Sequence, residues 1–131
     1  GFAYTSDKDM GVFTNQRKAA KWFHMAADQG YVKAQYILGK YYVTGKHSFP
    51  IDDAQAFKYY GLAAKQGHAP AQYYLGQMYY HGQSVPKNIE ESLKWLKLAA
   101  EQGIDNAKRD IPIFEEEKRI ADENLQKNNE R

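Results

Sequence analysis

Cysteine is absent from this chain of 131 residues, and its absence removes several kinds of structure and chemistry at once. The chain can form no disulfide bond and no cysteine-ligated zinc finger, and it has no thiol nucleophile. A periplasmic protein need not contain cysteine, so this absence does not determine the compartment.

Long apolar runs and an excess of one charge are also missing. No apolar stretch approaches the ~20 residues of a transmembrane helix, and the first residues show no signal peptide. Lys and Arg number 18 against 16 Asp and Glu, for a net charge of +2. We therefore predict a soluble protein, cytoplasmic or periplasmic or secreted, with no nucleic-acid partner and no membrane insertion.

Two short strings recur along the chain and define its organisation. Ala-Ala-x-Gln-Gly begins at Ala26, Ala63 and Ala99, at offsets of 37 and 36 residues. Ala-Gln-Tyr-x-Leu-Gly begins at Ala34 and again at Ala71, 37 residues later. An aromatic residue lies four positions before each Ala-Ala pair, and these are Trp22, Tyr59 and Trp95. A period of this length is typical of solenoid proteins.

Each repeat is predicted to contain two helices. Between Lys33 and Thr44 the apolar residues follow the 3.6-residue period of a helix, and a glycine follows directly. Asp52 and Asn88 have the sequence spacing of helix-capping residues before the second helix of their units. The predicted helices are Lys33–Thr44, Asp52–Gln66, Pro70–His81 and Glu90–Gln102.

The two ends of the chain depart from this pattern. The segment 15–29 matches the second helix of a unit, while residues 1–14 are predicted to form only a loop. A last helix is predicted to start near Pro112, because proline suits the first helical turn, and to carry a stripe from Phe114 to Leu125. Its other faces are charged, as expected of a helix that caps a stack of repeats.

The combined pattern resembles the Sel-1-like repeat, a relative of the tetratricopeptide repeat. The first-helix motif Ala-x-x-x-Leu-Gly-x-x-Tyr-x-x-Gly is carried by Ala34, Leu38, Gly39, Tyr42 and Gly45, and by Ala71, Leu75, Gly76, Tyr79 and Gly82. The resemblance implies an all-α fold, a right-handed α/α superhelix (solenoid) of antiparallel helix pairs. It also implies an adaptor or scaffold in protein complexes, often bacterial, without catalytic activity.

On this basis residues 1–131 are predicted to form a single Sel-1-like repeat domain. It would comprise a partial repeat over 1–30, repeats over 31–67 and 68–103, and a C-terminal capping helix over 104–131.

Residues that could carry catalysis lack the required spacing. The four histidines, His24, His47, His68 and His81, show no metal-ligand motif. No serine stands in a Gly-x-Ser-x-Gly context, and no glycine-rich phosphate loop occurs. We therefore expect no enzymatic activity, no cofactor and no metal site.

Tyrosine is the abundant residue, with 11 copies, and several have no role in the repeat motif. On the first helix of a unit one stripe lies opposite the face that carries Ala34, Leu38 and Tyr41. Its members are Tyr36, Lys40 and Val43 in one unit and Tyr73, Gln77 and Tyr80 in the next. We predict that these six residues, hereafter the row residues, line the concave groove of the solenoid and contact a partner. The alternative is that Tyr36 and Tyr73 pack against the neighbouring second helices, since each first helix lies between two of them.

The function predicted from the sequence is capture of a protein or peptide in this groove by a non-enzymatic module. A more specific form of this hypothesis is an inhibitor or immunity-type binder of a cognate protein. The structural alternative is self-association, as a fragment of a longer repeat array, through the N-terminal helix. The apolar face of that helix includes Trp22 and Phe23 and has no preceding layer.

Overall fold

A computed structural model describes residues 7–130 of the chain, with side-chain environments from residue 16 onward. This part consists of six α-helices and one short 3-10 turn, and it contains no strand. The elements are α1 (Asp7–Asp28), α2 (Val32–Thr44), η1 (Lys46–Ser48), α3 (Asp53–Lys65), α4 (Ala69–His81), α5 (Ile89–Glu101) and α6 (Asp105–Asn129).

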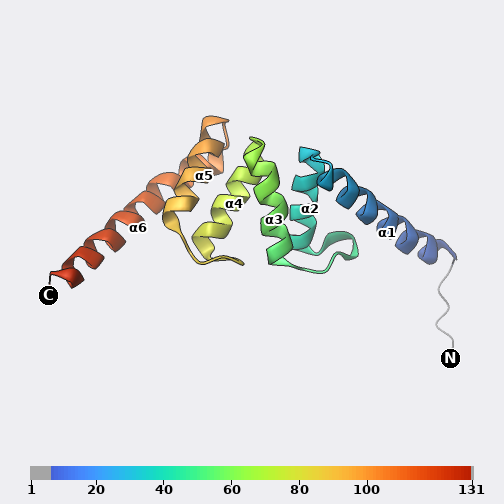
Figure 1. The fold of residues 1–131 in the computed structure, drawn as a ribbon, viewed down its shortest axis with the longest axis horizontal. Helices are drawn as coiled ribbons and strands as arrows, with labels where there is room; N and C mark the ends of the chain where they lie inside the picture. Colours follow the sequence, from blue (N-terminus) through green and yellow to red (C-terminus); the bar gives the residue numbers. More distant parts are fainter. Residues whose placement is uncertain (1–6, 131) are drawn as a thin grey trace, which may run out of the picture.

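The helices follow one another along the long axis of the molecule (Figure 1), each packing against its neighbours in the chain. The helices α2 to α5 form the centre, while α1 and α6 slope away at the two ends (Figure 1). Two complete units, α2 with α3 and α4 with α5, repeat the same arrangement. The predicted all-α solenoid of helix pairs is confirmed.

Helix ends in the two complete units lie within one residue of the predicted positions, because local signals define them. The Asp52 carboxylate accepts hydrogen bonds from the backbone N–H groups of Ala54 and Gln55 at the start of α3. The Asn88 side chain accepts one from the Glu91 N–H at the start of α5. These side chains satisfy helix N–H groups that would otherwise have no partner.

Two boundaries at the ends were predicted wrongly. The first helix begins at Asp7, so most of the predicted loop over residues 1–14 is helical, and residues 1–6 lie outside the described part. Nothing in this segment blocks a helix, since it has no proline and one glycine costs only about 1 kcal/mol.

The last helix begins at Asp105 and continues through Pro112 without a break. Proline removes one backbone hydrogen bond, here to the carbonyl of Lys108. Both residues are exposed, so water can satisfy that carbonyl.

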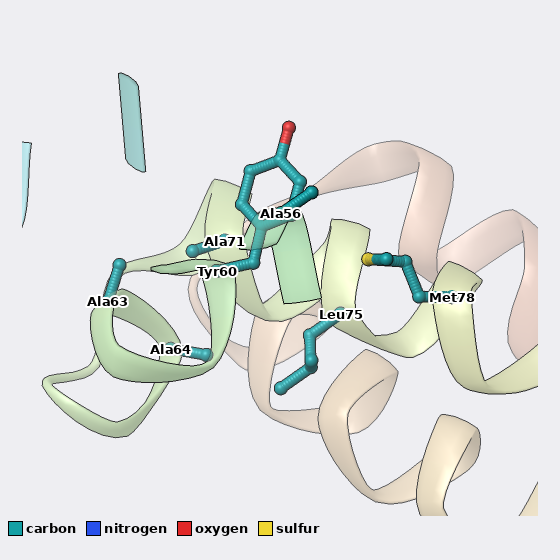
Figure 2. Close-up of a cluster of buried hydrophobic side chains, with 7 residues drawn as sticks. All are labelled: Ala56, Tyr60, Ala63, Ala64, Ala71, Leu75 and Met78. Carbon is teal, nitrogen blue, oxygen red and sulfur yellow. The ribbon is translucent and has the colours of Figure 1, made fainter. Parts of the chain in front are cut away.

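Small side chains dominate the contact between helices. Alanines of α3 and α4 are fully buried and let the two backbones approach, while three larger side chains fill the remaining space (Figure 2). The cluster drawn there comprises Ala56, Tyr60, Ala63, Ala64, Ala71, Leu75 and Met78.

The closest approach within a unit occurs at the glycine of each first helix. A Cβ atom on Gly39 would lie 2.7 Å from Cδ1 of the Tyr60 ring, and one on Gly76 would lie 3.0 Å from Cγ of Leu96. Tyr60 is only 2% exposed and Leu96 is fully buried, so neither can move aside. These glycines therefore set the distance between the two helices of a unit.

Glutamine side chains connect each unit to the preceding one. The buried Gln35 side chain donates to the Ala27 carbonyl at the end of α1, and it accepts from Gln66 of α3 at 2.7 Å. Gln72 and Gln102 repeat these bonds one unit later, where Gln72 donates to the Ala64 carbonyl. The glutamines of the two recurring strings thus form one hydrogen-bond pattern, a role that the sequence analysis did not assign to them.

We expect Gly39→Ala to lower the free energy of unfolding by about 1–2 kcal/mol, because the added methyl group would overlap the Tyr60 ring. Gly61→Ala is the matched control, since Gly61 lies inside α3 with no atom within 4 Å of its added Cβ. That control should instead gain up to ~1 kcal/mol from better helix propensity. Urea unfolding followed by circular dichroism measures both, and equal effects of the two variants would contradict the close-approach argument.

Candidate functional site

The six row residues lie on one face of α2 and α4. Lys40 is exposed, and the other five are half-buried. The face is therefore accessible to solvent, although most of its side chains also contact the protein itself.

The Tyr36 ring packs among three aromatic rings, which belong to α3, to α4 and to the residue directly before α4. Its ring centroid lies 6.0 Å from that of Tyr60, 4.8 Å from His68 and 6.3 Å from Tyr74. Burial lowers the pKa of His68, and the nearby positive charge of Lys33 lowers it further. The neutral imidazole is thereby favoured as a packing partner for Tyr36.

The row residues of α4 contact α6. Tyr80 stacks face to face on Phe114, with ring centroids 3.7 Å apart. Its hydroxyl donates a hydrogen bond to the Glu117 carboxylate, and the Gln77 amide donates to Asp110 at 2.8 Å. Gln77 and Tyr80 thus pack between helices, and their contact with a partner stays a prediction. The alternative interpretation describes Tyr36, which packs against Tyr60 of α3, and Tyr73, which packs against the buried cluster of α5 and α6.

An ionic contact strengthens the same junction. The Lys87 ammonium lies 2.9 Å from the Glu117 carboxylate and 4.7 Å from the centroid of the Tyr80 ring. Hydrogen bonds from Tyr80 and Lys87 lower the pKa of Glu117, while the bond to Glu117 raises the pKa of Tyr80. This arrangement holds α6 on the face of α4.

The remaining row residues differ in how freely they face solvent. Val43 packs at the edge of the cluster formed by α3 and α4, and the Tyr73 ring lies against Tyr74 at 5.3 Å. Lys40 is the fully exposed member. The three row residues of α2, which are Tyr36, Lys40 and Val43, form the part of the row outside the contact with α6.

His24 has a structural role, because it connects three helices. The two ring nitrogens of His24 lie 3.1 Å from the hydroxyl of Tyr59 and 2.9 Å from the hydroxyl of Tyr42, so the imidazole joins α1, α2 and α3. Within residues 7–130, no three His, Asp or Glu side chains come together in a way that could hold a metal ion. In the same part of the chain, no helix has the length and apolar character needed to span a bilayer.

The variant Glu117→Gln tests the contact between α4 and α6, because its effect on the stability of the fold should depend on pH. A carboxyl group whose pKa falls on folding stabilises the folded state above its ordinary pKa of 4.5, and this contribution disappears as the pH falls further. We expect the variant to unfold more easily than the wild type at pH 7, and we expect this difference to shrink progressively as the pH falls below 4.5. Chemical unfolding at several pH values measures this, with Glu101→Gln on α5 as the control for loss of one carboxylate. A difference that does not change with pH would contradict the role given to Glu117.

Comparison with known proteins agrees with the helix pairs. The family model described as Sel1 repeat matches residues 3–31, 32–68 and 69–104. No curated protein matches the chain. The solved structures that resemble it include a protective antigen present in uropathogenic Escherichia coli strains, which displays an SLR fold and is 46% identical with a TM-score of 0.66. They also include a Sel1 repeat protein from Oxalobacter formigenes, 38% identical with a TM-score of 0.68.

Both neighbours are longer than this chain. The first match covers 70% of this chain and 20% of the antigen, and the second covers 72% of this chain and 38% of the Oxalobacter protein. Sel1 repeat proteins are generally non-catalytic modules for protein interaction. With three matched repeats spanning most of its length, this chain belongs to the Sel1 repeat family.

Proposed function

We propose that this chain is a non-catalytic adaptor module that binds a protein or peptide partner along the row residues of α2 and α4. The observation that carries the proposal is that a tyrosine and, four residues later, a polar side chain recur at equivalent positions of two successive units, with Lys40 of the first unit exposed. Membership of a family of interaction modules supports it.

The uncovered part of the row indicates which contacts a partner would make. The outer edge of Tyr36 offers apolar area, and Lys40 offers a cation that can bind a carboxylate. The chain carries no second charged row residue, so one acidic group on the partner suffices to match it. The partner proposed here is an extended protein segment with an acidic residue beside an apolar one. An inhibitor of a cognate protein would use the same contacts.

Lys40→Glu tests this surface without disturbing the core, because Lys40 is exposed. We expect the variant to lose roughly tenfold in affinity for a partner captured from an extract of the source cells, since it places like charges opposite each other. Lys65→Glu, exposed near the end of α3, is the matched control with the same change of charge. Surface plasmon resonance with the identified partner measures both variants, and equal affinities would move the binding surface away from Lys40.

A further inference from the structure

The N-terminal end of the solenoid carries an apolar groove between α1 and α2 that none of the row residues lines. Its volume is about 690 Å³, and Lys33 is the one charged side chain among its described lining residues. The lining comprises Trp22, Phe23, Met25, Ala26, Gln29, Tyr31, Lys33, Ala34 and Ile37. Trp22, Met25 and Tyr31 are each at least 60% exposed, which is unusual for side chains of this size.

The repeat identifies the buried counterpart of Trp22. Tyr59, which is 37 residues later, is only 3% exposed and packs against α1 and α2. Trp95 is 36 residues further on, half-buried against the cluster that α3 and α4 form. In both complete units this aromatic residue therefore contacts the first helix of its own unit. Trp22, by contrast, is 62% exposed.

The same comparison shows which side chain fills the groove in a complete unit. Tyr36 of α2 lies among Tyr60, His68 and Tyr74. The residues 37 positions earlier in the chain are Phe23, Tyr31 and Ile37, and all three line the groove. The groove is therefore the counterpart, one unit earlier, of the site in which Tyr36 packs.

Three further contacts of α2 define the rest of the complementary surface. Gly39 lies against Tyr60, Tyr42 stacks parallel to Tyr59 at 6.2 Å, and Gln35 accepts a hydrogen bond from Gln66. The corresponding residues in α1 and directly after it are Phe23, Trp22 and Gln29, and these too line the groove. A helix that presents Gln-Tyr-x-Leu-Gly-x-x-Tyr on one face would match all of them at once.

We propose that this groove binds an amphipathic helix of a partner protein that carries such a Gln-Tyr-x-Leu-Gly-x-x-Tyr face. The partner helix would lie on α1 as α2 lies on α3, with its first tyrosine between Phe23, Tyr31 and Ile37. Helix-in-groove recognition of this kind depends on a few apolar anchors at helical spacing.

A second copy of this chain fits the groove less well. A two-fold contact through the groove would bring Lys33 of both copies into the same apolar interface. A head-to-tail contact would bring the apolar groove onto the opposite end of the stack. There the cleft between α5 and α6 is lined mainly by charged residues, among them Glu90, Lys94, Lys97, Glu115, Lys118 and Arg119.

A synthetic peptide with the sequence of residues 31–45, acetylated and amidated, is the probe, because it contains the complete face of α2. We expect it to bind the wild-type chain with a dissociation constant on the order of 10–100 µM, since a short helix must become ordered on binding. Binding should move the fluorescence emission of Trp22 to shorter wavelength and give heat in isothermal titration calorimetry. The control peptide carries Tyr36→Ala and Leu38→Asp and should not bind.

Two protein variants locate the binding surface. Trp22→Ser should weaken binding of the peptide by at least about tenfold. Ile51→Ser, which changes a side chain 71% exposed and outside the groove, should leave binding unchanged. Since both changed residues are exposed, neither variant should alter the melting temperature.

Other outcomes would overturn the proposal. Equal binding of the two peptides, or no binding by either method, would show that the groove does not recognise this face. A chain that is dimeric in light scattering, and becomes monomeric with Trp22→Ser, would show that a second copy covers the groove. None of these outcomes bears on the row residues, so the proposed function is tested separately.

Discussion

The contact between the two helices of a unit is the interaction on which the rest of this structure depends. It is made at Gly39 against Tyr60 and at Gly76 against Leu96, where a Cβ atom on the first helix would lie 2.7 Å and 3.0 Å from the facing side chain. Because the backbones approach this closely, the alanines of the second helix are excluded from water, and Tyr60 and Leu96 are buried in the contact. The positions of the outer faces follow from this spacing.

Hydrogen bonds made by glutamine side chains then position each unit against the preceding one. Gln35 and Gln72 are buried, yet each is satisfied by a carbonyl of the preceding unit and by a glutamine of its own unit. A buried amide that lacked these partners would destabilise the fold, so the bonds favour one register between units. That register places Tyr36 and Tyr73 at equivalent points of successive first helices. It also places Phe23, Tyr31 and Ile37, the counterparts of the residues around Tyr36, in the groove between α1 and α2.

The two ends of the stack differ in how they meet solvent. In α6, Pro112 stands where the first helices of the complete units have glycine, and Lys118 stands where they have their terminal glycine. A proline ring at that point leaves no room for a second helix at the distance seen within the units. Without a terminal glycine the helix continues to Asn129, with charged residues around it. The α1 end presents Trp22 and Met25 beside an apolar groove, whereas the exposed apolar side chains of α6, Ile113, Ile120 and Leu125, lie among charged residues.

The sequence by itself determined the helix pairs, their boundaries in the complete units and the family. These depend on local signals, namely the period of apolar residues, the capping residues and the glycines, which recur in register. It also placed Trp22 on an apolar face of the first helix, and Trp22 is 62% exposed. Which row residues have partners within the chain depends instead on how the helices pack. Tyr80 and Gln77 are equivalent in sequence to Val43 and Lys40, yet they contact α6 because that helix packs beside α4. The start of α1 and the continuation of α6 through Pro112 also depend on the tertiary structure. Solvent exposure and packing, rather than the local sequence pattern, determine whether a helix tolerates a glycine or a proline.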